Sequence, residues 1–150
     1  MSHSYLGVFV QYVFSTKNRQ PWIDSSLEER LWPYVGGIAR SNNMKALAVG
    51  GASDHLHSLI SLPSTLSVAD AVRLLKAGSS KWIHDQFSTY ADFSWQDGYG
   101  SFSVSPSQID SVIAYIKNQK EHHRCKTFKE EFLEFLDKSG VEYNPRYVFR

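Results

Sequence analysis

Two histidines with one residue between them are the first candidates for chemistry in this sequence. His55 and His57 flank Leu56 in an apolar stretch that predicts a β-strand. Side chains alternate between the faces of a strand, so both imidazoles would point one way and Leu56 the other way, into the core. Two imidazoles on one face can hold a divalent metal ion, but a bare pair is also common as two hydrogen-bonded histidines. Cupin-like and amidohydrolase sites use the same spacing, so a metal site requires a further ligand elsewhere in the chain.

A tyrosine and a glutamine later in the chain offer a nucleophile and such a ligand. Tyr115 and Gln119 are four residues apart, which is one turn of a helix. Apolar residues at helical spacing predict a helix here: Ile109, Val112, Ile113 and Ile116. A phenol with a pKa of about 10 is a weak nucleophile at neutral pH and requires an electrophile polarised by a metal. The Gln119 amide oxygen suits a hard ion such as Mg²⁺ or Mn²⁺. Taken alone, Tyr115 would be a boundary residue with its hydroxyl in water.

Three segments resemble those of a known family. Residues 54–60, Asp-His-Leu-His-Ser-Leu-Ile, are similar to the His-hydrophobic-His (HUH) motif of single-strand DNA nucleases. Residues 115–123, Tyr-Ile-Lys-Asn-Gln-Lys-Glu-His-His, resemble the tyrosine helix of the insertion-sequence-200-like transposases, the 200/605 group. Residues 95–105, Trp-Gln-Asp-Gly-Tyr-Gly-Ser-Phe-Ser-Val-Ser, resemble the segment that precedes this helix. The similarity extends to residues 143–147, and the two catalytic motifs in this order are jointly specific.

The resemblance implies a transposase that cuts and rejoins single-stranded DNA at mobile-element ends through a covalent 5′-phosphotyrosine. It implies that Tyr115 is the nucleophile and that His55, His57 and Gln119 bind Mg²⁺ or Mn²⁺. Asp54 also matches, and it either orients part of the metal site or caps the turn. The family recognises DNA hairpins and works as a homodimer, in which the tyrosine helix can complete the partner's site.

Two further groups of residues are candidates for supporting roles. A hinge before the tyrosine helix would let this helix reach a partner subunit, and its candidates are Gly98, Gly100 and residues 103–107. Side chains for DNA contact are chosen by charge, position and family match, and they are Lys17, Arg19, Arg73, Lys76, Lys120, His122 and Arg124. The alternative for the basic residues is solvated helix faces, and for His122 it is packing against the last helix.

Composition restricts the class of protein. The chain has 150 residues, 42% hydrophobic and 21% charged, which suits one domain over residues 1–150. A net charge of +1 does not by itself indicate a nucleic-acid binder. No apolar run approaches the length of a membrane span and the N-terminus lacks a leader pattern, so we expect a cytoplasmic protein without membrane contact. Cys125 is the only cysteine, which excludes an internal disulfide and a thiolate zinc cluster.

The order of predicted elements indicates an α+β fold, namely a ferredoxin-like antiparallel sheet with helices packed on it. Strands are predicted at 5–15, 44–50, 55–62 and 101–105, with a further edge strand in the tail 141–150. Helices are predicted at 25–41, from 67 onward, at 106–123 and at 127–139. In the first helix we expect a cap by Ser25, and Leu27, Leu31, Tyr34 and Ile38 recur at the spacing of one helical face. In the second we expect burial of Val68, Val72, Leu75 and Trp82.

Three other functions are compatible with these motifs. A single-stranded DNA-binding protein descended from such an enzyme would not need an intact Tyr115, Gln119 and histidine pair. A nuclease of the same chemistry could process chromosomal palindromes without mobilising an element. An unrelated metal hydrolase using His55 and His57 would keep its activity without Tyr115.

Overall fold

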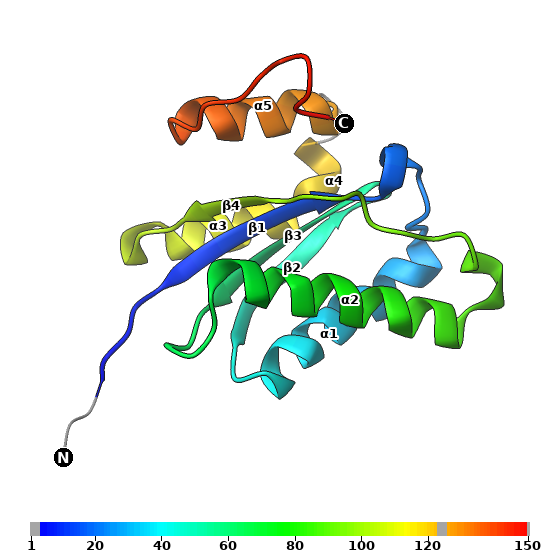
Figure 1. Cartoon of the computed structure of the whole chain (residues 1–150), viewed down its shortest axis with the longest axis horizontal. Coiled ribbons are helices and arrows are strands. Elements are labelled where there is room, and N and C mark those ends of the chain that lie inside the picture. The colour runs from blue at the N-terminus through cyan, green and yellow to red at the C-terminus, as the bar shows by residue number, and fades with distance from the viewer. Residues whose placement is uncertain (1–3, 123–125, 150) are drawn as a thin grey trace.

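A computed structural model of the chain describes residues 4–122 and 126–149. Its centre is an antiparallel sheet of four strands in the order β2-β3-β1-β4 (Figure 1). The strands are β1 (Phe9–Ser15), β2 (Lys45–Ala52), β3 (His55–Ser61) and β4 (Gly100–Ser103). With a helix between β1 and β2 and another between β3 and β4, this is the ferredoxin-like arrangement, and the predicted fold class is confirmed.

Helices cover both faces of the sheet. Two long helices pack on one face, α1 (Ser25–Ser41) and α2 (Val68–Gln86). The other face carries α3 (Ile109–Lys117), α4 (Gln119–His122) and α5 (Phe128–Lys138). Three short 3₁₀ turns complete the elements: η1 (Lys17–Arg19), η2 (Ser88–Tyr90) and η3 (Pro106–Gln108). Among the described residues, no helix has the length and apolar character needed to cross a membrane.

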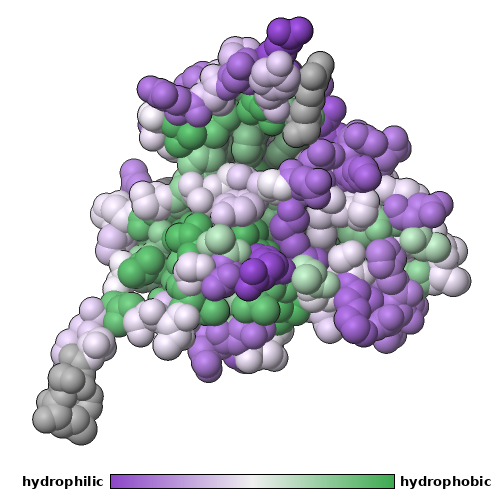
Figure 2. Space-filling view, viewed as in Figure 1, coloured by the Kyte–Doolittle hydropathy of each residue, from purple (hydrophilic) through white to green (hydrophobic). Residues whose placement is uncertain are grey.

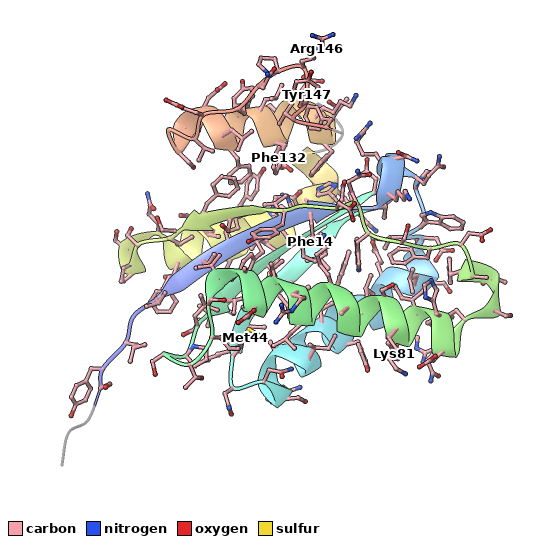
Figure 3. The ribbon with its side chains drawn as sticks, in the orientation of Figure 1. Phe14, Met44, Lys81, Phe132, Arg146 and Tyr147 are labelled. Atoms are coloured by element: carbon pink, nitrogen blue, oxygen red, sulfur yellow. The ribbon has the colours of Figure 1, made fainter. Side chains whose placement is uncertain are left out.

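The alternation along β1 separates the two faces. Tyr12 and Phe14 are buried in the large core beneath α1 and α2. Val13 packs on the opposite side in a smaller cluster to which Phe132 of α5 also belongs. Figure 3 labels Phe14 and Phe132, which lie on opposite sides of the sheet. The sheet therefore has an apolar face that stabilises the fold and a second face that is free to carry polar side chains under α3 and α5.

Several local predictions are corrected. Helix α1 has the predicted bounds, but its cap is Asp24, whose carboxylate accepts a hydrogen bond from the backbone N–H of Leu27. Ser25 is already inside the helix. Tyr34 and Val68 are exposed, because the stripes that face the core are shifted from the predicted ones. The stripes are Leu27, Leu31, Val35 and Ala39 in α1, and Ala71, Val72, Leu75, Ser79 and Ile83 in α2.

Two longer elements also differ from expectation. The helix predicted at 106–123 is divided into a 3₁₀ turn, α3 and α4, with a break at Asn118. The first strand begins at Phe9 rather than at residue 5. The described part of the tail, residues 141–149, forms turns and no strand, because α5 ends at Lys138 and Gly140 reverses the chain with φ +67°.

Candidate metal and nucleophile site

Strand β3 presents both motif histidines to the face covered by α3 and α5. His55 and His57 are fully buried, while Leu56 points into the core beneath α1 and α2, as the alternation predicts. Because β3 lies between β1 and β2, its backbone is held on both sides: His57 pairs with Val13 of β1 and with Gly50 of β2. The two rings lie 5.2 Å apart between centroids. A rigid central strand thus fixes the imidazoles side by side.

Asp54 and Gln119 contact the two nitrogens of His55. His55 Nδ1 donates to Asp54 Oδ1 at 2.8 Å, and Nε2 lies 2.9 Å from Gln119 Oε1. The Gln119 side chain is buried, and its amide nitrogen donates to the backbone oxygen of Tyr115 at 3.4 Å, which directs the amide oxygen toward His55. In the neutral form of His55 with its hydrogen on Nδ1, the lone pair of Nε2 faces the Gln119 oxygen, and a cation between these two atoms would be bound by both.

Gln11 and Glu131 occupy the two nitrogens of His57, and sequence reasoning missed both. The amide nitrogen of Gln11 on β1 lies 3.1 Å from His57 Nδ1, and Glu131 Oε1 on α5 lies 2.9 Å from His57 Nε2. Gln11 is 3% exposed and Glu131 is 2% exposed. A sequence signal for Glu131 did exist, because a carboxylate interrupts the apolar stripe of α5, formed by Phe128, Phe132, Phe135 and Leu136.

Tyr115 reaches the same carboxylate from α3. Its hydroxyl donates to Glu131 Oε2, and its ring lies 5.8 Å from the His57 ring between centroids. Burial, followed by the hydrogen bond and the negative charge of Glu131, raises the pKa of the Tyr115 phenol. In this arrangement the phenol is held firmly in its protonated form. A cavity of about 380 Å³ opens onto the hydroxyl, lined by Tyr115, Glu121, Lys126, Glu131, Glu134, Phe135 and Lys138.

The break at Asn118 determines how Tyr115 and Gln119 share the site. Helix α3 ends at Lys117, and the Asn118 N–H bonds to the carbonyls of Ala114 and Tyr115. Gln119 then begins α4. The four-residue spacing predicts that the two side chains are neighbours on one continuous helix. The break at Asn118 places them on two separate helices instead. Gln119 points to His55, whereas Tyr115 points to Glu131 on the His57 side.

The donor atoms fit a divalent metal ion. Ligand atoms of His55, His57 and Glu131 lie within 4.8 Å of one another, and Glu131 Oε1 is 3.7 Å from His55 Nε2. The nitrogen-to-oxygen distances of 2.9 Å at both histidines are those of hydrogen bonds. They are also compatible with an octahedral ion, whose neighbouring ligands at bonds of about 2.1 Å are separated by about 3 Å. Imidazole nitrogens suit transition metals, and carboxylate and amide oxygens suit harder ions such as Mg²⁺ and Mn²⁺, so this mixed set fits a divalent ion without selecting one.

The basic residues predicted to contact DNA lie in separate places. Lys17 and Arg19 belong to η1, and Arg73 and Lys76 lie on α2. Lys120 of α4 forms an ion pair with Glu28. His122 ends α4, and its side chain lies outside the described part of the chain, as do Arg124 and Cys125. Lys76 is engaged in structure, because its ammonium donates to the carbonyls of Gln96 and Gly98 at 2.7 and 2.8 Å.

Comparison with known proteins identifies the family. Residues 4–119 match the family model described as "Transposase IS200 like", so the chain belongs to this family of tyrosine transposases. The motif histidines, Tyr115 and Gln119 all fall within the matched residues, whereas Glu131 lies beyond them. None of the curated proteins matches the sequence.

Two solved structures share the fold. A candidate transposase from Deinococcus radiodurans R1 superposes with a TM-score of 0.63 at 21% identity, covering 79% of this chain and 96% of that one. A REP-associated tyrosine transposase bound to a REP hairpin superposes with a TM-score of 0.59 at 14% identity, covering 82% of this chain and 74% of that one. At these identities the likeness establishes the fold alone.

Proposed function

We propose that this protein is a metal-dependent transposase that cleaves and rejoins single-stranded DNA at mobile-element ends, with Tyr115 as its nucleophile. The observation that carries the proposal is the shared Glu131 carboxylate, because one oxygen holds the Tyr115 hydroxyl while the other lies among the metal-ligating atoms of His55 and His57. One buried side chain thus contacts both the nucleophile and the proposed metal site. This arrangement suits attack by the nucleophile on a phosphate that the metal binds.

In the proposed reaction, the Tyr115 hydroxyl replaces the 3′ oxygen at the scissile phosphate. Tyr115 Oη forms a bond to phosphorus, the bond from phosphorus to the 3′ oxygen breaks, and the phenolic proton ends on the released 3′-hydroxyl. The products are a 5′-phosphotyrosine and a free 3′ end. One phosphodiester replaces another, so rejoining by the reverse step needs no nucleoside triphosphate. A bound Mn²⁺ or Mg²⁺ would polarise the scissile phosphate and offset the charge that develops on it.

Four side chains would hold that ion, and two more would orient them. His55, His57, Gln119 and Glu131 supply the ligand atoms. Asp54 and Gln11 contact the outer nitrogens of the two imidazoles and so determine which nitrogen of each ring faces the centre.

DNA hairpins are the proposed substrate and a homodimer the proposed assembly. The REP-associated relative is bound to a hairpin, which supports the first of these by analogy of fold. Within one chain, Tyr115 lies beside its own His57, which supports a site completed by the same subunit, whereas exchange of the tyrosine helix would complete the partner's site. A mixed dimer of Tyr115→Phe and His57→Ala subunits tests for shared sites. Cleavage returns if the tyrosine helix is exchanged between subunits, and it stays absent if each chain uses its own tyrosine.

The function is tested by covalent capture. The protein is incubated with labelled hairpin DNA carrying single-stranded flanks, with Mn²⁺ or with chelator, and run on a denaturing gel. We expect a protein–DNA adduct with metal that is absent with chelator and absent in Tyr115→Phe. Tyr34→Phe is the matched control, because Tyr34 lies on α1 and stacks on Trp82, on the face of the sheet opposite the metal ligands. Cleavage products without any adduct would exclude a tyrosine transposase mechanism.

A further inference from the structure

Tyr99 lies at the edge of the sheet, immediately before β4, and its side chain stands between two hollows. The first is a cavity of about 290 Å³ between the end of β1, residues 96–99, α5 and the tail. The second is a cavity of about 320 Å³ between α2 and residues 98–99. Tyr99 lines both, and it is 41% exposed although its ring packs edge-on against Tyr12 at 6.2 Å. Part of a large aromatic ring is therefore presented to solvent at a fixed position.

The first hollow is lined mainly by aromatic and apolar side chains, and its charged residues are Arg19, Asp97 and Glu142. Phe14, Phe128, Phe132, Tyr143 and Phe149 line it together with Tyr99. In Figure 2, hydrophobic surface is visible below α5, the helix at the top of that view. A flat aromatic ring is the kind of ligand that such walls favour, because stacking and apolar contact require no particular pattern of hydrogen bonds.

Cations flank Tyr99 on both sides. Arg19 lines the first hollow, with its guanidinium 5.6 Å from the Phe149 ring centroid. Arg73 and Lys76 line the second. The Arg73 side chain is 72% exposed and pairs with Asp70 only at the surface, so an exchange of that partner for a phosphate costs little. Lys76 holds the Gln96 and Gly98 carbonyls and thereby fixes the segment that carries Tyr99.

The first hollow adjoins the metal and nucleophile site. Phe128, which lines the hollow, lies 4.9 Å from the His55 ring between centroids. The hollow is thus separated from a metal ligand by one aromatic ring. The exposed aromatic ring, the flanking cations and this proximity together indicate single-stranded nucleic acid as the occupant.

We infer that Tyr99 is a stacking platform for an unpaired base of the DNA strand that enters the active site, with Arg19 and Arg73 contacting phosphates on either side of it. The inference rests on the proposed function and extends it by assigning a surface to the single-stranded flank of the substrate. Tyr99 here is a binding residue and takes no part in bond cleavage.

The test is a binding cycle between protein and DNA variants. Affinity for a fluorescent hairpin with a single-stranded flank is measured by anisotropy at fixed salt, for wild type, Tyr99→Ala and Tyr99→Trp. Loss of one stacked base corresponds to a weakening of about 5- to 150-fold, which we expect for Tyr99→Ala, with recovery in Tyr99→Trp. Tyr34→Ala is the matched control, because Tyr34 is 39% exposed and stacks on Trp82, on the α1 and α2 side of the sheet.

A scan of single abasic sites along the flank then identifies the base. At one position, removal of the base should weaken wild-type binding as much as Tyr99→Ala does, and the two losses should not add. Additive losses at every position, or wild-type affinity in Tyr99→Ala with an unchanged melting temperature, would overturn the inference. Adduct formation by the wild type is measured in the same samples. If the wild type forms an adduct, such a result contradicts only the role of Tyr99; if no adduct forms at all, the proposed function itself fails.

Discussion

Glu131 of α5 accepts a hydrogen bond from the Tyr115 hydroxyl of α3 and, through its other oxygen, lies 2.9 Å from Nε2 of His57. Two helices that are separate in sequence are thus joined at the proposed catalytic centre by one buried carboxylate. If Tyr115 is the nucleophile and Glu131 a metal ligand, as we propose, metal binding and placement of the nucleophile depend on each other. The C-terminal helix, which the family match does not include, is in this account part of the active site.

Replacement of Glu131 by glutamine should weaken metal binding. Glu131→Gln keeps the size of the side chain but removes the charge that the ion would neutralise. We expect the Mn²⁺ affinity measured by calorimetry to fall by about tenfold or more, with fewer adducts at limiting metal. Glu134→Gln removes an equal charge from the same cavity and serves as the control. Equal affinities in both variants would show that Glu131 is not a ligand.

Gln11 should affect metal binding without touching the metal. In the described arrangement its amide N–H donates to His57 Nδ1, which places the ring hydrogen on Nε2, facing Glu131. Metal binding requires the opposite arrangement, in which the Gln11 oxygen accepts from Nδ1–H and Nε2 is a ligand. We predict that Gln11→Leu lowers Mn²⁺ affinity by about tenfold and that Gln11→Glu, an acceptor only, retains it. If Gln11→Leu binds Mn²⁺ as tightly as the wild type, Gln11 does not orient His57 for metal binding.

The close contact between β2 and α3 should control the position of Tyr115. A Cβ added at Gly50 would lie 2.6 Å from the carbonyl oxygen of Ile116, the residue after Tyr115. Gly50→Ala must therefore displace α3, at a cost of about 1–3 kcal/mol in the free energy of unfolding. We expect slower adduct formation with Mn²⁺ affinity largely kept. In Gly36→Ala the new Cβ meets nothing within 4 Å, so this variant should react like the wild type.

The cap of α1 should contribute to stability in a pH-dependent way. The hydrogen bond from the Tyr90 hydroxyl, at 2.6 Å, and those from the helix backbone hold the pKa of Asp24 below its usual range. Because the folded state favours the ionised form, this stabilisation is present at neutral pH and is lost as pH falls through the lowered pKa. Asp24→Ala should cost about 1 kcal/mol at pH 7. Asp24→Asn should keep a cap but lose stability less steeply on acidification, as measured by thermal unfolding.

Local patterns in the sequence were sufficient to predict the strand that carries His55 and His57 and much of the fold. The alternation at His55, Leu56 and His57 predicted the strand and its two faces, because period-2 burial is a property of adjacent residues. The bounds of α1 also followed from local signals. The predicted fold class is correct because few arrangements of these elements bury one face of a sheet beneath two helices.

The missing parts of the site depend on contacts between distant segments. Glu131 is 74 residues from His57, and Gln11 is 46 residues from it. Neither pairing has a local signature beyond one carboxylate in an apolar helical stripe. The break at Asn118 also escaped prediction, because the residues around it have ordinary helical spacing and Gln119 is turned by its contact with His55. Long-range polar contacts, rather than propensity, determine these details.

The most direct test of the central claim is to identify the amino acid that becomes linked to DNA. The adduct formed with hairpin DNA and Mn²⁺ is digested with protease and nuclease, and the modified peptide is sequenced by mass spectrometry. We predict a nucleotide that is joined through its 5′ phosphate to Tyr115. Linkage to another residue, or efficient cleavage that leaves Tyr115 unmodified throughout, would contradict it.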